Sequence, residues 1–170
     1  IYLMLKKIIL DCDPGHDDAV AIMLAAANED IEILGITCVG GNTTLENTKI
    51  NSLKICSLIE RTDLNIYSGA EKPLKYDLVT AAHVHGKSGL DIEGSPIIIS
   101  ENFNLQDQHA VDFIIQTCHD YEDQVYLCVT GPLTNMLFDL VERHKNKLKV
   151  RVGNLSVVIN KKSNCLYQPT

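Results

Sequence analysis

The stretch that decides the fold runs from residue 7 to residue 19 and reads Lys7-Ile8-Ile9-Leu10-Asp11-Cys12-Asp13-Pro14-Gly15-His16-Asp17-Asp18-Ala19. It begins as a short apolar run and then becomes polar around Pro14 and Gly15, which is the form of a buried strand followed by a turn. From Asp17 to Asn28 the sequence is Ala-rich and apolar almost all round, with two carboxylates in its first turn, where the helix dipole favours negative charge. We therefore predict a central strand followed by a buried helix.

The alternation of strand and helix continues downstream. β-branched runs predict further strands, and apolar residues at helical spacing predict further helices. The predicted strands are 31–39, 65–69, 125–129 and 155–159, and the predicted helices are 51–60, 111–118 and 133–140. This order predicts an α/β fold with an open, mainly parallel sheet, helices on both faces, and a ligand site at the carboxyl ends of the strands.

Two stretches depart from this pattern. Residues 71–104 lose periodicity and gather Pro, Gly and Ser, and so long an irregular stretch in a compact domain is usually functional or mobile. After Glu142 the sequence turns basic, and residues 160–170 are polar and patternless. We expect the sheet to end near 125–129 and 155–159 at an incompletely covered edge, and such an edge favours self-association.

Composition excludes several classes of protein. The chain has 170 residues, 45% of them hydrophobic and 22% charged, as in one soluble globular domain. Its net charge of −7, with only 5% aromatic residues and no Trp, argues against nucleic acid as a partner. The apolar opening is too short for a membrane span, and six scattered cysteines without a CxxC pair suit a reducing compartment. We expect a cytoplasmic protein that does not bind membranes.

Four carboxylates crowd the turn after the first strand, namely Asp11, Asp13, Asp17 and Asp18. Like charges so close together are costly unless a positive charge sits among them, and oxygen ligands without cysteine pairs select a hard cation such as Ca²⁺ or Mg²⁺. The alternative is that Asp17 or Asp18 caps the helix and that Asp11 and Asp13 are turn residues. The number of carboxylates favours a metal site, with Asp11 as the most structural of the four.

The run from Ile8 to Ala19 resembles the N-terminal signature of the inosine-uridine-preferring nucleoside hydrolases, which cleave the N-glycosidic bond of ribonucleosides. The resemblance continues in three further motifs, which are Gly41-Asn42-Thr43-Thr44, His83-Val84-His85-Gly86 with Ser88-Gly89, and Thr130-Gly131-Pro132-Leu133-Thr134-Asn135. It covers about residues 6 to 142. It implies that residues 1–145 form the N-terminal portion of such a domain, that residues 146–170 are a divergent tail, and that the chain is truncated.

The resemblance also implies a calcium site. Asp13 matches the carboxylate that contacts a calcium-bound water and acts as general base, and Asp18 matches a direct calcium ligand. Thr130 matches a residue whose backbone carbonyl binds the metal, so Ca²⁺ is expected to bind through Asp13, Asp18 and the Thr130 carbonyl. The implied reaction passes through an oxocarbenium-like sugar, which nearby anions stabilise.

Three further residues match substrate-binding positions of the family. Asp17 resembles the group that holds a ribose hydroxyl, Asn42 a residue that lines the ribose pocket, and His85 a residue on the nucleobase side. The implied partner is a small ribonucleoside, and a homo-oligomer is compatible with the sequence. Purine and pyrimidine nucleosides are not distinguished.

Two other functions remain open at this point. The Asp11-Cys12-Asp13 run is similar to the Asp-x-Asp that ends the first strand of haloacid-dehalogenase-like phosphatases, although that superfamily expects Thr or Val where Gly15 stands and has no role for Asp17 and Asp18. A non-catalytic, truncated fragment that binds nucleoside or metal is the other alternative, because another metal-binding Asp and a leaving-group His of the family have no candidate after residue 155.

Overall fold

The computed structural model describes residues 5–90, 104–121 and 124–136, and the backbone of three later strands. The elements in chain order are β1 (Lys6–Cys12), α1 (His16–Ala27), β2 (Ile31–Cys38), α2 (Leu45–Leu58), β3 (Ile66–Ser68), α3 (Ala82–His85), β4 (Leu105–Gln106), α4 (Ala110–Asp120), β5 (Val125–Val129), β6 (Leu148–Val152), β7 (Leu155–Asn160) and β8 (Ser163–Pro169).

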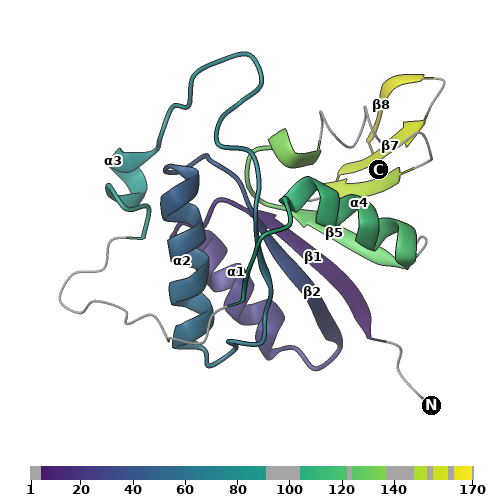
Figure 1. Ribbon diagram of the computed structural model, residues 1–170. Helices are drawn as coiled ribbons and strands as arrows, with labels where there is room; N and C mark the ends of the chain where they lie inside the picture. Colours follow the sequence, from purple (N-terminus) through teal and green to yellow (C-terminus); the bar gives the residue numbers. More distant parts are fainter. Residues whose placement is uncertain are drawn as a thin grey trace.

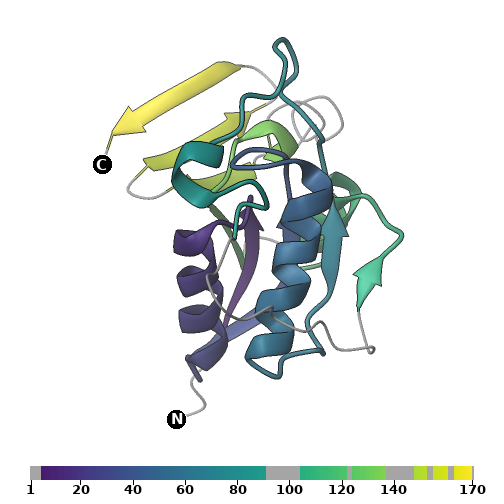
Figure 2. The same cartoon turned by 90° about the vertical axis from the view of Figure 1, so that its left-hand side faces the viewer.

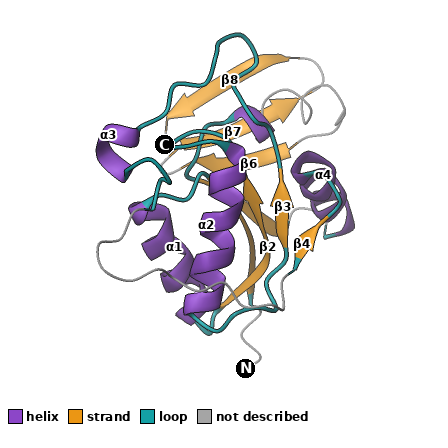
Figure 3. Ribbon diagram, turned by 60° about the vertical axis from the view of Figure 1, so that its left-hand side comes forward, coloured by secondary structure: helices purple, strands orange, loops and turns teal. Residues whose placement is uncertain are grey.

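One open sheet organises the molecule, with strand order β4-β3-β2-β1-β5-β6-β7-β8 (Figure 1). All pairings from β4 to β6 are parallel, whereas β7 and β8 add in antiparallel fashion. Helices α1 and α2 cover one face of the sheet and α4 covers the other (Figure 3). The predicted α/β fold with a mainly parallel sheet is confirmed.

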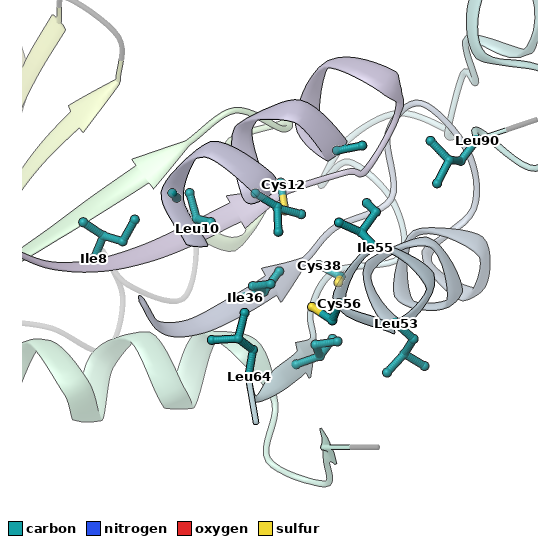
Figure 4. Close-up of a cluster of buried hydrophobic side chains, with 14 of the residues drawn as sticks. Ile8, Leu10, Cys12, Ile36, Cys38, Leu53, Ile55, Cys56, Leu64 and Leu90 are labelled. Carbon is teal, nitrogen blue, oxygen red and sulfur yellow. The ribbon is translucent and has the colours of Figure 1, made fainter. Parts of the chain in front are cut away.

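Strand β1 is buried on both faces, which explains its unbroken apolar run. Ile8 and Leu10 point into the core cluster beneath α1 and α2, while Ile9 points into the cluster beneath α4. On the α1 and α2 side, Ile36 of β2 packs with Ile55 of α2 (Figure 4). The described cysteines are free thiols, and three of them lie in this core as small apolar side chains.

The ends of the helices differ from the sequence expectation. Helix α1 begins at His16 with Gly15 as N-cap and without a side-chain cap, so neither Asp17 nor Asp18 caps it. Helix α2 begins earlier than predicted, because the side chain of Thr44 accepts a hydrogen bond from the Asn47 N–H. Of the predicted helix 133–140, a helical turn at 134–136 is described, and residues 137–140 lie outside the described residues.

Two expectations about the end of the sheet are wrong. Strand β5 lies between β1 and β6, and β7 lies between β6 and β8, so neither is an edge. Residues 163–169, predicted to be patternless, form β8, because pairing with β7 satisfies the backbone groups of a segment without its own apolar period. Among the described residues, no helix is both long and apolar enough to cross a membrane.

Candidate functional site

The candidate site lies where the chain order of the sheet reverses. From β1 the chain continues to β2 on one side, and β5 pairs on the other side of β1. The loops after these parallel strands open at the same edge, which is where α/β sheets bind ligands. They bring together residues 13–15, 39–44 and 130–135. Short helix α3 lies beside the start of α1 (Figure 2), since the ring of His85 lies against Gly15.

Asp13 is the central side chain of this site and is 5% exposed. The backbone N–H of Asn42 donates to its Oδ2 (2.6 Å), and the Asn42 side-chain amide donates to its carbonyl (3.0 Å). A Cβ at Gly41 would overlap the carboxylate, and one at Gly131 would lie 2.9 Å from its Oδ1. The two glycines therefore leave the space that the carboxylate fills. Burial, together with the charge of Asp18, raises the pKa of Asp13 to about 7.

Asp18 lies behind Asp13 in the first turn of α1 and is buried. Burial is the main reason that its pKa is raised, and the charge of Asp17 adds to the effect. The Thr130 side chain and the backbone N–H groups of Asp13 and Gly15 favour its ionised form and so limit the rise of its pKa. Thr130 is itself held to β1, because its N–H donates to the Asp11 carbonyl (2.9 Å). The structure thus brings the three predicted metal ligands together.

The three predicted substrate residues lie around this centre in different settings. Asp17 is exposed in the first turn of α1, and Asn42 is half-buried against Asp13. His85 ends α3 and stacks on His16 with ring centroids 5.7 Å apart. Its Nδ1 is buried and has no hydrogen-bond partner among the described residues. Asn42 and His85 are joined through the backbone, because the Ala81 N–H at the start of α3 donates to the Asn42 carbonyl (2.9 Å).

Asp11 belongs to a network of buried side-chain hydrogen bonds, whose other members the sequence analysis did not identify. Thr37 Oγ1 (2.6 Å) and Asn135 Nδ2 (2.8 Å) both donate to its Oδ1. Asn135 also donates to the Cys38 carbonyl and accepts the Ala70 N–H. Burial, partly offset by these bonds, raises the pKa of Asp11 to about 6. In the sequence, the only indication of a role for Asn135 is its position as the last residue of the motif that begins at Thr130. Nothing in the sequence indicates a role for Thr37.

The donor chemistry of this site fits a hard cation. The negative charge of Asp18 adds to the raised pKa of Asp13, and a cation between the two carboxylates would relieve this repulsion. The described residues hold no group of three or more His, Cys, Asp or Glu side chains arranged as a metal site. Calcium takes about six to eight oxygen ligands. The carboxylates of Asp13 and Asp18 and the Thr130 carbonyl would therefore supply only part of its coordination sphere.

An open parallel sheet with carboxylates at the carboxyl ends of its strands is the arrangement of α/β enzymes that act on small ligands. Residues 8–158 match the sequence model of one family of such enzymes, the inosine-uridine preferring nucleoside hydrolases. The chain belongs to this family. The phosphatase alternative loses its support. Asp11, the first residue of the Asp-x-Asp run, is fully buried near the carboxyl end of β1 and is hydrogen-bonded to Thr37 and Asn135.

Curated relatives and solved structures agree with this assignment. The chain is 42% identical over 133 residues to the pyrimidine-specific ribonucleoside hydrolase RihA of Photobacterium profundum, covering 78% of this chain and 42% of the relative. It is 42% identical over 131 residues to RihB of Escherichia coli O1:K1, covering 77% and 41%. The purine-preferring ribonucleoside hydrolase from Gardnerella vaginalis superposes with a TM-score of 0.74 at 34% identity, covering 81% and 44%. The chain therefore spans less than half the length of these relatives.

Proposed function

We propose that this chain carries the general base and part of the metal site of a ribonucleoside hydrolase, which cleaves the N-glycosidic bond to give ribose and free base. The observation that carries the proposal is Asp13, a buried carboxylate at the carboxyl ends of the strands, whose pKa in the metal-free site is raised by burial to about 7. A general base works best when its pKa lies near the operating pH.

Asp13 is held for this role by its neighbours. The Asn42 N–H fixes Oδ2, and the space left by Gly41 and Gly131 admits the carboxylate but no further side-chain atoms. Held in this way, Asp13 can accept a proton from a water that attacks the sugar carbon. The carboxylates nearby would also favour the positive charge that develops on the ribose.

Asp13, Asp18 and the Thr130 carbonyl would hold a calcium ion, with the remaining ligands supplied from outside this set. When bound, the ion supplies positive charge that makes a water more acidic and that orients ribose hydroxyls. The Thr130 side chain and two backbone N–H groups favour the ionised form of Asp18 that a metal ligand needs.

Asp17, Asn42 and His85 are proposed to contact the nucleoside. The exposed carboxylate of Asp17 suits a ribose hydroxyl, and the buried Nδ1 of His85 offers an unused hydrogen-bonding atom beside the site. The names of the relatives include both pyrimidine-specific and purine-preferring enzymes. The proposed substrate class is therefore a ribonucleoside, without a choice of base.

The role of Asp13 is tested in a chimaera in which this sequence replaces the aligned 133-residue segment of the Photobacterium RihA. Asp13→Asn should lower the rate of ribose release by on the order of 10²–10⁴-fold, because the amide cannot accept the proton. The control is Asp30→Asn, an exposed carboxylate beyond the far end of α1. Undiminished release by the Asp13 variant would show that the base is misassigned.

Metal binding is tested on the 170-residue chain by titration calorimetry with calcium. We expect weak binding that Asp18→Ala abolishes, since it removes one of two carboxylates from a partial site. Asp63→Ala is the matched control, because Asp63 is a surface partner of Arg61. Equal calcium uptake by the Asp18 variant and the parent would eliminate the proposed ligand.

A further inference from the structure

Thr43, just before the N-cap of α2, and Asn47 and Asn51 within the helix form a polar row with a spacing of four residues. Of these, Asn51 is completely buried. A buried amide in a helix that otherwise packs on an apolar core is costly unless its hydrogen bonds are satisfied. Its contacts therefore indicate what it does in the fold.

The side-chain amide of Asn51 joins two segments that are distant in the sequence. Its Nδ2 donates to the Pro14 carbonyl (3.0 Å) and to the Ser88 carbonyl (2.8 Å). Both neighbours are acceptors only, so the NH₂ end of the amide must face them, and both of its N–H groups are used. The Oδ1 atom is buried without a partner among the described residues, so the two donated bonds fix the side chain.

The Ser88 segment is held at further points by the same row. The Lys87 carbonyl accepts from Thr43 Oγ1 (3.2 Å) and from Asn47 Nδ2 (3.4 Å). Gly86 and Gly89 have φ values of 78° and 82°, which a side chain would oppose, and a Cβ at Gly89 would lie 2.6 Å from Thr43. These contacts define the path of residues 86–89 directly after His85.

We propose that Asn51 is a positioning residue, which holds the turn bearing Asp13 against the loop that follows His85 and so sets the distance between the base and the nucleobase side of the site. The inference rests on the proposed function for the roles of Asp13 and His85. Asn51 itself is separated from the substrate by the Pro14 and Ser88 backbones that it holds, so it acts through the turn and the loop.

The two halves of the proposal can be separated by comparing three variants. Asn51→Leu removes the donors to both segments at similar volume. Asn47→Ala removes a donor to the 86–89 loop alone, because Asn47 reaches Thr43 and Lys87 but not the Pro14 turn. Ile55→Val, one turn further along α2 in the apolar core, lowers stability without removing a hydrogen bond to either segment.

Hydrogen exchange of the 170-residue chain, without calcium or nucleoside, gives the readout. In Asn51→Leu, amides of residues 13–19 and 85–90 should exchange about tenfold faster relative to core amides of β1 and β2. In Asn47→Ala only residues 85–90 should respond, and in Ile55→Val neither segment should change relative to the core. Asn51→Ser, which keeps one donor, should give an intermediate result and serves if the Leu variant does not fold.

A purely structural role for Asn51 predicts instead that its variants accelerate all amides together, as Ile55→Val does, and that result would overturn the proposal. Unchanged exchange in both segments would overturn it as well. Because the measurement involves neither metal nor substrate, its outcome is independent of the activity assay. The chimaera could fail to release ribose while the amides of residues 13–19 and 85–90 still depend on Asn51 for protection from exchange. That result would reject the proposed function but not the positioning role of Asn51.

Discussion

At the residue scale, the site depends on two carboxylates that differ in their surroundings although they are two positions apart. Asp11 is fully enclosed and accepts side-chain hydrogen bonds from Thr37 and Asn135. Asp13 lies in the space between two glycines, with one backbone donor on Oδ2. Desolvation is the largest cause of the raised pKa of both groups. The same fold thus encloses Asp11 in side-chain hydrogen bonds, whereas the surroundings of Asp13 suit the proton transfer that we propose for it.

These pKa values predict that the metal-free protein loses stability as pH rises from about 4 to about 7. A carboxyl whose native pKa is raised stays protonated in the folded chain while it ionises in the unfolded chain above the ordinary value of 3.8. Over this window the unfolded state binds fewer protons, so the free energy of unfolding falls by about 1.4 kcal/mol per pH unit for each such group. Asp11 contributes up to about pH 6 and Asp13 up to about pH 7.

Urea unfolding at a series of pH values, in the presence of a calcium chelator, measures this slope. Asp13→Asn should reduce this slope, most clearly between about pH 6 and 7 where Asp11 no longer contributes, because the amide has the same shape and does not titrate. Stability that rises with pH over this window, in both proteins, would contradict the prediction.

At the scale of secondary-structure elements, Asn135 ties the ends of three strands to the loop after β5. Its amide contacts the Asp11 side chain at β1, the Cys38 carbonyl at β2 and the Ala70 N–H after β3. Gly69 allows this close approach, since a Cβ there would overlap the Asn135 side chain. The loop that carries Thr130 is in this way attached to the strand ends that carry Asp13 and Asn42.

Asn135→Ala should therefore destabilise the protein by about 3 kcal/mol, because it leaves several buried polar groups without partners. The control is Gln116→Ala, which removes an exposed hydrogen bond to Asp120 and should change stability by less than about 0.5 kcal/mol. Denaturant unfolding of both variants gives the comparison. A similar small effect for the two would mean that the Asn135 contacts do not hold the strand ends together.

At the scale of the whole molecule, the edges of the described sheet are β4 and β8. Strand β4 has two residues, whereas β8 has seven and pairs with β7 along one side. An edge of this length presents unpaired backbone groups to other chains. Self-association, which the sequence predicts near 125–129 and 155–159, is therefore expected at β8.

Sedimentation velocity over a range of concentrations should show reversible association of the chain. Leu166→Pro and Tyr167→Pro distinguish the two sides of β8, because successive N–H groups of a strand point in opposite directions. One of the two should weaken association while the melting temperature stays near that of the parent, and the other should disrupt pairing with β7. Association that neither substitution affects would place the contact elsewhere on the molecule.

The sequence by itself determined the alternation of strand and helix from β1 to β3 and from α4 to β5, the class of fold, and the position of the acidic residues at the end of β1. It did not indicate α3, β4, β6 or β8. The features that it determined depend on local periodicity and on the turn at Pro14 and Gly15, which neighbouring residues encode. The motifs also placed Asp13, Asp18 and Thr130 as one group, and the structure brings them together. Their roles as ligands and base stay predictions.

Only the tertiary structure decided the strand order, the pairing of β7 with β8, and the environment of each polar side chain. Asn51 reaches Pro14 and Ser88 across 37 residues in each direction, and Asn135 reaches Asp11 across 124. The hydrophobic period of a strand or helix depends only on nearby residues. Contacts at such separations arise when these elements pack together, so no periodicity in the sequence encodes them. The raised pKa of Asp13 belongs to the same category, since it comes mainly from burial, which neighbours from the loop after β2, from α1 and from the 130–135 loop create together.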